Sequence, residues 1–220
     1  ASLYLNGQVT HWAEKCQLLW REIPLFLDMM PNGRAILVLR DPRSVLASFK
    51  RYTYAPPPAY VGAIFNCLDA MKGGQQMASE LPEDRFLIVR YEDAARDPIG
   101  TARKLLSFLK ISGEDYALDR TRWQDVHGRP WVANSSFHDP GKTREFDIEA
   151  SIHRWKQALS PAEIGLTEEV CGPYMDHFGY KLSGVVARWT DIARLFMADD
   201  TITGHFRKWL FTGEGIEEFP

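Results

Sequence analysis

The chain has 220 residues, which is enough for one substantial domain with a hydrophobic core rather than two small ones. Its 45% of hydrophobic and 25% of charged residues are ordinary globular values, so this composition excludes disordered and fibrous proteins. The net charge of −3 argues against general binding to nucleic acids or to anionic membranes.

The first predicted elements are a short strand and a helix. Residues 10–15 form a mixed segment that we expect as a strand ending near Lys15, and residues 23–30 have helical character, with Pro24 in the first turn. The Pro-Asn-Gly sequence at 31–33 is a turn signal that leads the chain into an apolar run.

A strand, a tight turn and a helix are predicted over residues 35–52. The unbroken apolar run Ala35–Leu39 suits a strand covered on both faces, as in the parallel sheet of an α/β fold. Asp41 suits the N-cap of the helix, and Pro42 suits its first turn because the N–H that proline lacks would be unpaired there. Arg40, free backbone N–H groups and the positive helix end should therefore converge on an anion, most naturally a phosphate.

The same stretch carries a local excess of positive charge. Between residues 34 and 51 a single acid, Asp41, accompanies five basic residues: Arg34, Arg40, Arg43, Lys50 and Arg51. Ser44 and Ser48 lie one turn apart on one face of the predicted helix and add hydroxyl groups. This local surplus of four charges favours an anionic ligand at the turn.

The following segments predict a βαβ unit. The proline-rich residues 55–58 cannot be helical, and we expect them as a loop beside the substrate cleft. Apolar residues at helical spacing over 61–71 predict a long helix, with a weak point at the glycine pair 73–74. A second apolar run at 86–89 predicts a strand parallel to the first.

Beyond the second strand, the sequence predicts helices and one long loop. Asp97-Pro98 and the capping box Ser160–Glu163 are helix start signals, and a further helix is expected through residues 152–159. Residues 126–145 lack periodicity and predict a loop of about twenty residues, whose length suggests a function. Apolar stripes over residues 186–210 predict helices that pack on the domain, with an oligomer contact as the alternative.

Several short motifs occur in an order and at a spacing that are typical of one known family. They are Arg40-Asp41-Pro42-Arg43 with Ser48 eight residues after Arg40, Arg90-Tyr91-Glu92-Asp93 with Pro98, and Glu14-Lys15 upstream. Together they resemble the sulfotransferases that use 3′-phosphoadenosine 5′-phosphosulfate (PAPS). The resemblance implies an α/β fold, a three-layer sandwich around a mainly parallel sheet, related to the P-loop hydrolases. We therefore expect a sulfotransferase domain over residues 1–182 and a helical extension over 183–220 packed on it.

The resemblance implies that Arg40, Ser48 and Tyr91 hold the nucleotide part of the cofactor. Arg40 and Ser48 match the family residues that grip the 3′-phosphate, for which a guanidinium and a hydroxyl are suitable donors. Tyr91 matches the tyrosine that contacts adenine, and its planar ring suits a base. The alternatives are an Arg40 that merely pairs with Asp41, and an interior Tyr91. Glu92-Asp93 are interpreted as structural acids.

The resemblance also implies residues near the transferred group. Lys15 matches the family lysine that neutralises charge on the sulfuryl group and the leaving phosphate, and the alternative is an ordinary exposed lysine. Ser135 and Ser136 resemble a serine-bearing loop beside the cofactor. Lys142 and Arg144 would complete a phosphate clamp there.

One part of the family pattern is missing from residues 1–220. The family begins with a strand and a Gly/Ser-rich loop whose N–H groups cradle the 5′-phosphosulfate, and no such cluster precedes a helix here. We therefore expect an N-terminally truncated sulfotransferase that binds the product adenosine 3′,5′-bisphosphate weakly and is inactive by itself. The alternative is a degenerate relative that only binds. Gln17 stands where some members carry a histidine, so no general base is assigned.

The expected function is transfer of a sulfuryl group from PAPS to a hydroxyl or amine of a small molecule, a carbohydrate or a carrier-bound intermediate. One alternative is a nucleotide kinase, which would need a Walker loop and acidic magnesium ligands. Another is a non-catalytic module that binds adenosine bisphosphate or a partner. We expect no metal, nucleic acid or membrane partner. Three widely spaced cysteines and the lack of an apolar run of ~20 residues favour a cytoplasmic location.

Overall fold

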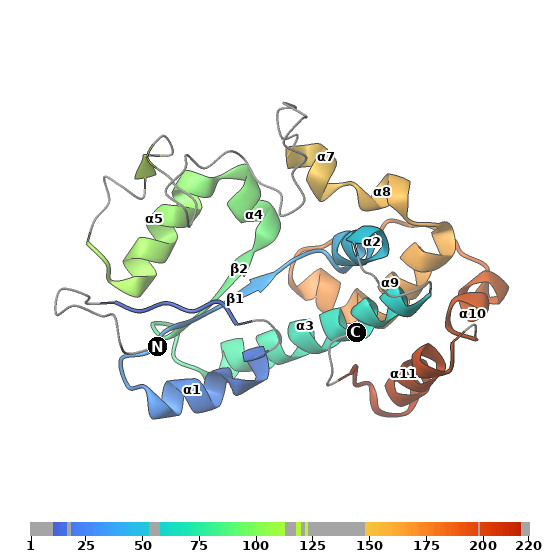
Figure 1. The fold of residues 1–220 in the computed structure, drawn as a ribbon, viewed down its shortest axis with the longest axis horizontal. Helices are drawn as coiled ribbons and strands as arrows, with labels where there is room; N and C mark the ends of the chain where they lie inside the picture. Colours follow the sequence, from blue (N-terminus) through green and yellow to red (C-terminus); the bar gives the residue numbers. More distant parts are fainter. Residues whose placement is uncertain are drawn as a thin grey trace.

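The computed structural model describes residues 11–16, 19–52, 58–112, 118–119, 122, 148–197 and 199–216. Within these segments the fold is rich in helices, which lie around a pair of strands (Figure 1). The elements follow in the order η2 (Leu19–Glu22), α1 (Ile23–Met29), β1 (Ala35–Leu39), α2 (Pro42–Tyr52), η3 (Ala59–Gly62), α3 (Ala63–Glu80), β2 (Phe86–Arg90), α4 (Tyr91–Arg96), α5 (Pro98–Leu109), α7 (Ile148–Ile152), α8 (Trp155–Ala158), α9 (Pro161–His177), α10 (Trp189–Met197) and α11 (Asp200–Thr212). Among the helices of these segments, none is both long and apolar enough to cross a membrane.

Strands β1 and β2 form a parallel pair at the centre of the fold (Figure 1). Ala35 lies opposite Phe86 at one end of the pair, and Leu39 lies opposite Arg90 at the other. The chain passes from β1 to β2 through α2, η3 and α3, which is the crossover that parallel neighbours require. The predicted βαβ unit and the α/β class are therefore confirmed.

The two faces of β1 have different surroundings. Leu37 and Leu39 are buried on the face toward α3, where Gly74 allows the helix to come close to Leu37. Val38 points the other way and is 60% exposed. The expectation that both faces of this strand are covered is therefore wrong at Val38. Because side chains alternate along a strand, Arg40 continues the open face of Val38.

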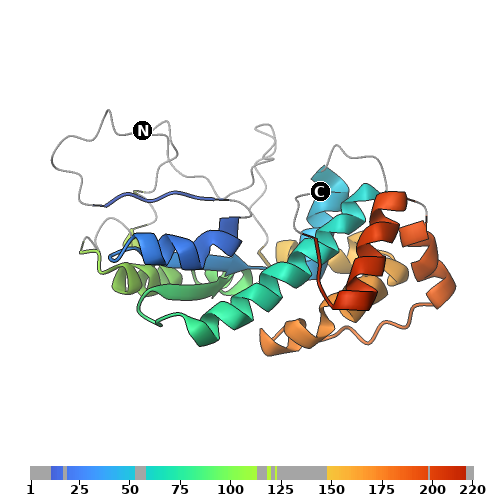
Figure 2. The same cartoon turned by 90° about the horizontal axis from the view of Figure 1, so that it is seen from below.

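Helix α3 runs along the covered face of the sheet and continues unbroken through the glycine pair at 73–74 (Figures 1 and 2). A β-carbon on Gly73 would overlap the indole of Trp20, and one on Gly74 would lie 2.8 Å from Leu37 Cδ2. The glycines are therefore points of close packing, where absence of a side chain admits a neighbour.

Helix α1 ends at Met29, as the sequence predicts, and Arg85 binds the groups that follow its last turn. The Arg85 guanidinium donates through Nη2 to the carbonyls of Leu27 at 2.6 Å and Met30 at 2.7 Å. Its Nε donates to the carbonyl of Gly33 at 3.2 Å. These carbonyls have no partner inside the helix, so one side chain satisfies the end of α1 and joins it to the start of β2.

Residues 11–16 form neither a strand nor a helix. All of them are exposed, and Figure 2 shows them as a separate trace beside α1. The predicted strand ending near Lys15 is therefore wrong. The reason is that its mixed polar and apolar residues meet no strand with which to pair among the described parts of the chain.

The helix predicted through residues 152–159 is instead two short helices, α7 and α8. The Oγ of Ser44 donates to the carbonyl of Ile152 at 2.7 Å. The N–H of Lys156, which a continuous helix would direct to Ile152, bonds to the carbonyl of His153 at 3.0 Å. A tertiary hydrogen bond therefore replaces a helical one and breaks the helix, which sequence periodicity does not reveal.

Helix α9 begins with the predicted capping box. The Ser160 Oγ accepts from the N–H of Glu163 at 3.3 Å, and the Glu163 Oε2 accepts from the N–H of Ser160 at 2.6 Å. The other start signal, at Asp97, is likewise confirmed, because its carboxylate accepts from the N–H of Gly100 at 2.8 Å at the start of α5. Local capping signals thus fixed both helix starts.

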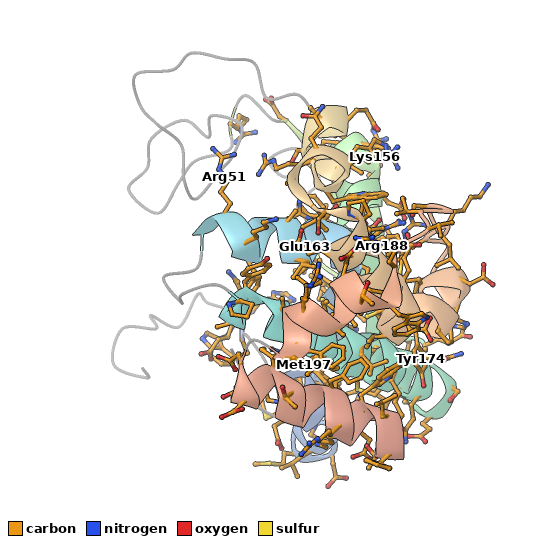
Figure 3. All side chains as sticks on the ribbon, turned by 90° about the vertical axis from the view of Figure 1, so that its right-hand side faces the viewer. Arg51, Lys156, Glu163, Tyr174, Arg188 and Met197 are labelled. Atoms are coloured by element: carbon orange, nitrogen blue, oxygen red, sulfur yellow. The ribbon has the colours of Figure 1, made fainter. Side chains whose placement is uncertain are left out.

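Helices α10 and α11 pack on α9 and on η3, respectively (Figure 3). The rings of Phe196 and Phe206 stack with centroids 3.9 Å apart, and Ile202 belongs to the main core. The apolar stripe is only partly covered, because Met197 is 72% and Phe211 87% exposed. The division of the chain after residue 182 stays a prediction.

Candidate anion-binding site

Arg40 and Tyr91 meet where the two strands end. Arg40 follows β1 directly and Tyr91 follows β2, and the pairing of Leu39 with Arg90 brings the two side by side. The Cζ of Arg40 lies 4.3 Å from the centroid of the Tyr91 ring. The structure therefore brings together two residues that the sequence assigns to the same nucleotide.

The guanidinium of Arg40 has a buried donor without a partner. Its Nε is shielded from solvent and makes no hydrogen bond with any described residue. Leaving such a donor unsatisfied costs about 1–3 kcal/mol, and more for a charged group. An anion that accepts from Arg40 would remove this cost.

The neighbouring acid, Asp41, is committed to Arg43. Its carboxylate accepts from the Arg43 Nε at 3.0 Å and from the Arg43 Nη2 at 2.7 Å. It also accepts from the backbone N–H of Arg43 at 2.9 Å, which confirms the predicted N-cap of α2. Among the described contacts, Asp41 thus binds Arg43, and the alternative in which it pairs with Arg40 is not observed.

Acids from distant parts of the chain neutralise other cations of this stretch. Arg43 donates to Glu168 at 2.6 Å and lies over the ring of Trp155, 4.0 Å from its centroid. Burial opposes the charge of Arg43, but Asp41 and Glu168 outweigh it and hold its pKa above the ordinary value. Lys50 pairs with Glu163 at 2.9 Å. Glu168 and Glu163 therefore offset two of the four surplus positive charges expected from the sequence.

Two backbone N–H groups at the start of α2 are already bound. The N–H of Asp41 donates to the Glu92 Oε1 at 2.9 Å, and that of Arg43 donates to Asp41. The expectation of free N–H groups is therefore wrong at these two positions. Glu92 is 2% exposed and its carboxylate accepts from the backbone at this turn, as its interpretation as a structural acid implies. The anion site depends on side chains, above all on Arg40.

The two serines of α2 have different surroundings. Ser44 is buried and gives its hydroxyl to the carbonyl of Ile152, so it is not available to a ligand. Ser48 is half-buried one turn further along the same face. The hydrogen bonds found within the described segments do not join Ser48 to Arg40, and the role of Ser48 stays a prediction.

The remaining predicted site residues stay predictions. Lys15 is exposed in the irregular segment 11–16. Ser135, Ser136, Lys142 and Arg144 lie outside the described residues, as does the expected loop 126–145. The segments that the structure describes hold no group of three or more His, Cys, Asp or Glu side chains able to bind a metal ion.

A model of the sulfotransferase family matches residues 2–115, which is more than half of the chain and includes Arg40 and Tyr91. The chain belongs to the sulfotransferase family. The matched range also contains the positions of Lys15 and Ser48, whose roles stay predictions.

Individual proteins resemble this sulfotransferase chain over most of its length. It is 28% identical over 176 residues to carbohydrate sulfotransferase 3 of Tetronarce californica, covering 72% of this chain and 38% of the relative. It is 33% identical over 176 residues to carbohydrate sulfotransferase 1 of Danio rerio, covering 71% and 40%. The chain thus spans less than half the length of these curated relatives.

A solved structure shows the same fold. The sulfotransferase domain from the curacin biosynthetic pathway aligns with a TM-score of 0.50 at 21% identity, covering 75% of this chain and 60% of that domain. At this identity the likeness bears on the fold alone. It agrees with the α/β sulfotransferase fold expected from the sequence.

Sequence reasoning missed Tyr180 and Glu168, which contact the strand-end turn of this sulfotransferase chain from α9. Tyr180 donates to the Glu92 Oε2 at 2.9 Å, and Glu168 binds Arg43. The one signal for Tyr180 was the preceding Gly179, because a glycine after a helical segment marks a C-terminal cap. Its partner is 88 residues away, and no local pattern predicts that pairing.

Proposed function

We propose that the chain holds the nucleotide-binding part of a sulfotransferase that uses PAPS as donor and forms adenosine 3′,5′-bisphosphate. The observation that carries this proposal is Arg40, with its unpartnered buried Nε over the ring of Tyr91. Both residues stand just beyond the carboxyl ends of parallel strands, where open α/β sheets bind their ligands.

The chemistry of these two residues fits a phosphorylated nucleoside. A phosphate offers acceptors to the Arg40 guanidinium in a charge-assisted geometry. The half-buried Tyr91 supplies an aromatic surface and a hydroxyl for adenine. Arg40 thus binds the 3′-phosphate and Tyr91 the base, while Ser48, Ser135 and Ser136 are proposed as further contacts on the resemblance alone.

The transferred group requires positive charge at its peripheral and leaving oxygens, because sulfuryl transfer resembles phosphoryl transfer in this respect. Lys15 is proposed for this role from its motif. Residues 1–220 contain no Gly/Ser-rich loop ahead of a helix to bind the 5′-phosphosulfate. We therefore propose that this polypeptide alone binds the bisphosphate weakly and transfers no sulfuryl group.

The acceptor is proposed to be a hydroxyl group of a carbohydrate. This choice rests on the two curated relatives, which are named carbohydrate sulfotransferases. An amine, a small molecule or a carrier-bound intermediate is the competing acceptor. Family membership favours sulfuryl transfer over the kinase alternative.

Calorimetric titration tests this proposal. Adenosine 3′,5′-bisphosphate should bind without metal, whereas ATP with magnesium should not bind. If ATP with magnesium binds and the bisphosphate does not, the result would support the phosphotransferase alternative. If neither ligand binds, the result would support a non-catalytic interaction module. Release of labelled sulfate from PAPS onto a carbohydrate by residues 1–220 alone would contradict the proposed inactivity.

A further inference from the structure

Tyr180 is placed by a turn that favours glycine. After α9 the N–H of Gly179 bonds to the carbonyl of Asp176 at 2.9 Å, and that of Tyr180 bonds to the carbonyl of Met175 at 2.8 Å. This is a Schellman motif, with Gly179 in the left-handed region at a φ of 75°. A β-carbon on Gly179 would also lie 3.1 Å from Arg90 Nη1. The end of α9 is thereby fixed against the end of β2.

The turn directs the Tyr180 hydroxyl to the buried carboxylate of Glu92. Tyr180 donates to the Glu92 Oε2 at 2.9 Å, and its ring lies under the guanidinium of Arg90, whose Cζ is 4.7 Å from the centroid. Burial and the nearby Glu92 carboxylate raise the pKa of Tyr180. The hydroxyl therefore stays protonated, and remains a donor, throughout the neutral range.

The other oxygen of Glu92 binds the backbone next to Arg40. The Glu92 Oε1 accepts from the N–H of Asp41 at 2.9 Å, and that nitrogen belongs to the peptide bond between Arg40 and Asp41. Because a peptide unit is planar, this hydrogen bond restrains the backbone on both sides of the bond, at Arg40 and at Asp41. Glu92 also follows Tyr91 directly, so one carboxylate constrains both members of the Arg40–Tyr91 pair.

Burying the Glu92 carboxylate only to stabilise the fold would be unfavourable in free energy. Within the described segments, no Arg, Lys or His nitrogen forms an ion pair with this carboxylate, although it is almost fully buried. Burying a charge without an ionic partner is unfavourable, and a well-packed apolar residue would often serve stability better. The two hydrogen bonds of Glu92 are directional, so they instead hold the Asp41 N–H and the Tyr180 hydroxyl in a defined arrangement.

We propose that Tyr180 and Glu92 are positioning residues of the anion site, which fix the Arg40–Asp41 peptide and so aim the Arg40 guanidinium at the 3′-phosphate. This inference rests on the proposed function. It extends the site to α9, through a residue beyond the segment that the family model matches. Neither residue needs to touch the ligand.

The test is a titration of wild type and variants with adenosine 3′,5′-bisphosphate and with adenosine 5′-monophosphate. Tyr180→Phe should weaken binding of the bisphosphate about tenfold, because a small misplacement is costly in a preorganised site, and leave binding of the monophosphate unchanged. Tyr174→Phe is the matched control, because it removes a tyrosine hydroxyl from α9, the helix that precedes Tyr180, and should change neither affinity. Figure 3 labels Tyr174 and Glu163 toward opposite ends of α9.

Further variants separate positioning from general stability. In an Arg40→Met background, Tyr180→Phe should cause no additional loss, because the side chain that it aims is gone. Glu92→Gln keeps an oxygen that can accept from the N–H of Asp41 and should retain more affinity for the bisphosphate than Glu92→Ala. It also provides a test if Tyr180→Phe fails to fold.

The outcomes distinguish this inference from the proposed function. A wild-type chain that does not prefer the bisphosphate would overturn both. A wild-type preference that Tyr180→Phe leaves intact would overturn only the inference. So would an equal loss for both nucleotides, or a full additional loss in the Arg40→Met background, since those results describe a destabilised fold.

Discussion

Arg40 and Arg43 are close in sequence but have different surroundings at the strand-end turn. Arg43 is 4% exposed and is bound by Asp41, Glu168 and the ring of Trp155. Arg40 lies over Tyr91 on the open side of β1, with a buried Nε that no described residue satisfies. The protein itself binds the donors of Arg43, whereas the Nε of Arg40 has no partner among the described residues and is the donor that we propose for a ligand. Position and charge alone do not distinguish the two.

The largest expected effect is loss of Arg43. Arg43→Met leaves Asp41 and Glu168 buried without their cation, and breaking a buried pair in this way costs about 3–5 kcal/mol. Urea denaturation should show this loss in the free energy of unfolding. Arg34→Met is the control, because Arg34 makes an exposed bond to the carbonyl of Asp84 and should change stability by less than about 0.5 kcal/mol. If Arg43→Met lowered the free energy of unfolding by less than about 1 kcal/mol, Arg43 would matter no more to stability than Arg40, and the difference drawn between them would be wrong.

The surroundings of Glu163 predict that the chain loses stability in acid. Burial disfavours its carboxylate, but hydrogen bonds from Tyr60, Lys50 and Ser160 outweigh burial and hold its pKa below the usual range. A lowered folded pKa gives stability that is present at neutral pH and is lost as the pH falls through that pKa. The advantage of wild type over Glu163→Gln should thus be about 1.5–3 kcal/mol at pH 7 and disappear toward pH 3.

Denaturation at a series of pH values measures this advantage. Lys50 lies on α2, the helix that follows Arg40, and is bound by Glu163. The result therefore extends the comparison to a second cation that the protein satisfies itself. An advantage that stays constant from pH 7 to pH 3 would show that the Glu163 charge contributes nothing.

Gly179→Ala should destabilise the chain by about 1–2 kcal/mol. The residue must keep a positive φ, and its new methyl group would approach Arg90. The loss should appear in thermal denaturation. Gly204→Ala is the matched control, because Gly204 lies within α11 with open space around it and should gain about 0.5–1 kcal/mol. Equal effects of the two substitutions would contradict the account of the α9 turn.

The smallest expected effect is that of Arg40 on stability. Arg40→Met removes an unsatisfied buried donor, which should stabilise the fold, and a contact with the Tyr91 ring, whose loss should destabilise it. Because the two effects oppose each other, the free energy of unfolding should change by less than about 1 kcal/mol. The same urea denaturation as for Arg43 measures this change. A loss as large as that of Arg43→Met would mean that Arg40 also serves the fold.

The elements that sequence predicted well are those with local causes. The strands at 35–39 and 86–90, their parallel pairing and the caps at Asp97 and Ser160 follow from apolar runs and short-range hydrogen bonds. Where a predicted helix was interrupted, the cause was a residue far away in the sequence. The helix through 152–159 is interrupted by Ser44, which is 108 residues from its partner.

The candidate site divides in the same way. Arg40 and Tyr91 were predicted from motifs, and the register of the two strands brings them together. The neutralisation of Arg43 was not predictable, because Glu168 is 125 residues away and nothing in the local sequence pairs them. A count of charges along the chain therefore overstated the positive field at the turn.

The most direct test is the contribution of Arg40 to recognition of the 3′-phosphate. Calorimetry should compare adenosine 3′,5′-bisphosphate with adenosine 5′-monophosphate, for wild type and for Arg40→Met. Wild type should prefer the bisphosphate by about 10- to 100-fold, as a charge-assisted phosphate contact of about 1.5–3 kcal/mol implies, and this preference should vanish in Arg40→Met. A preference that persists unchanged in a folded Arg40→Met chain would contradict the assignment of Arg40 as the phosphate-binding residue.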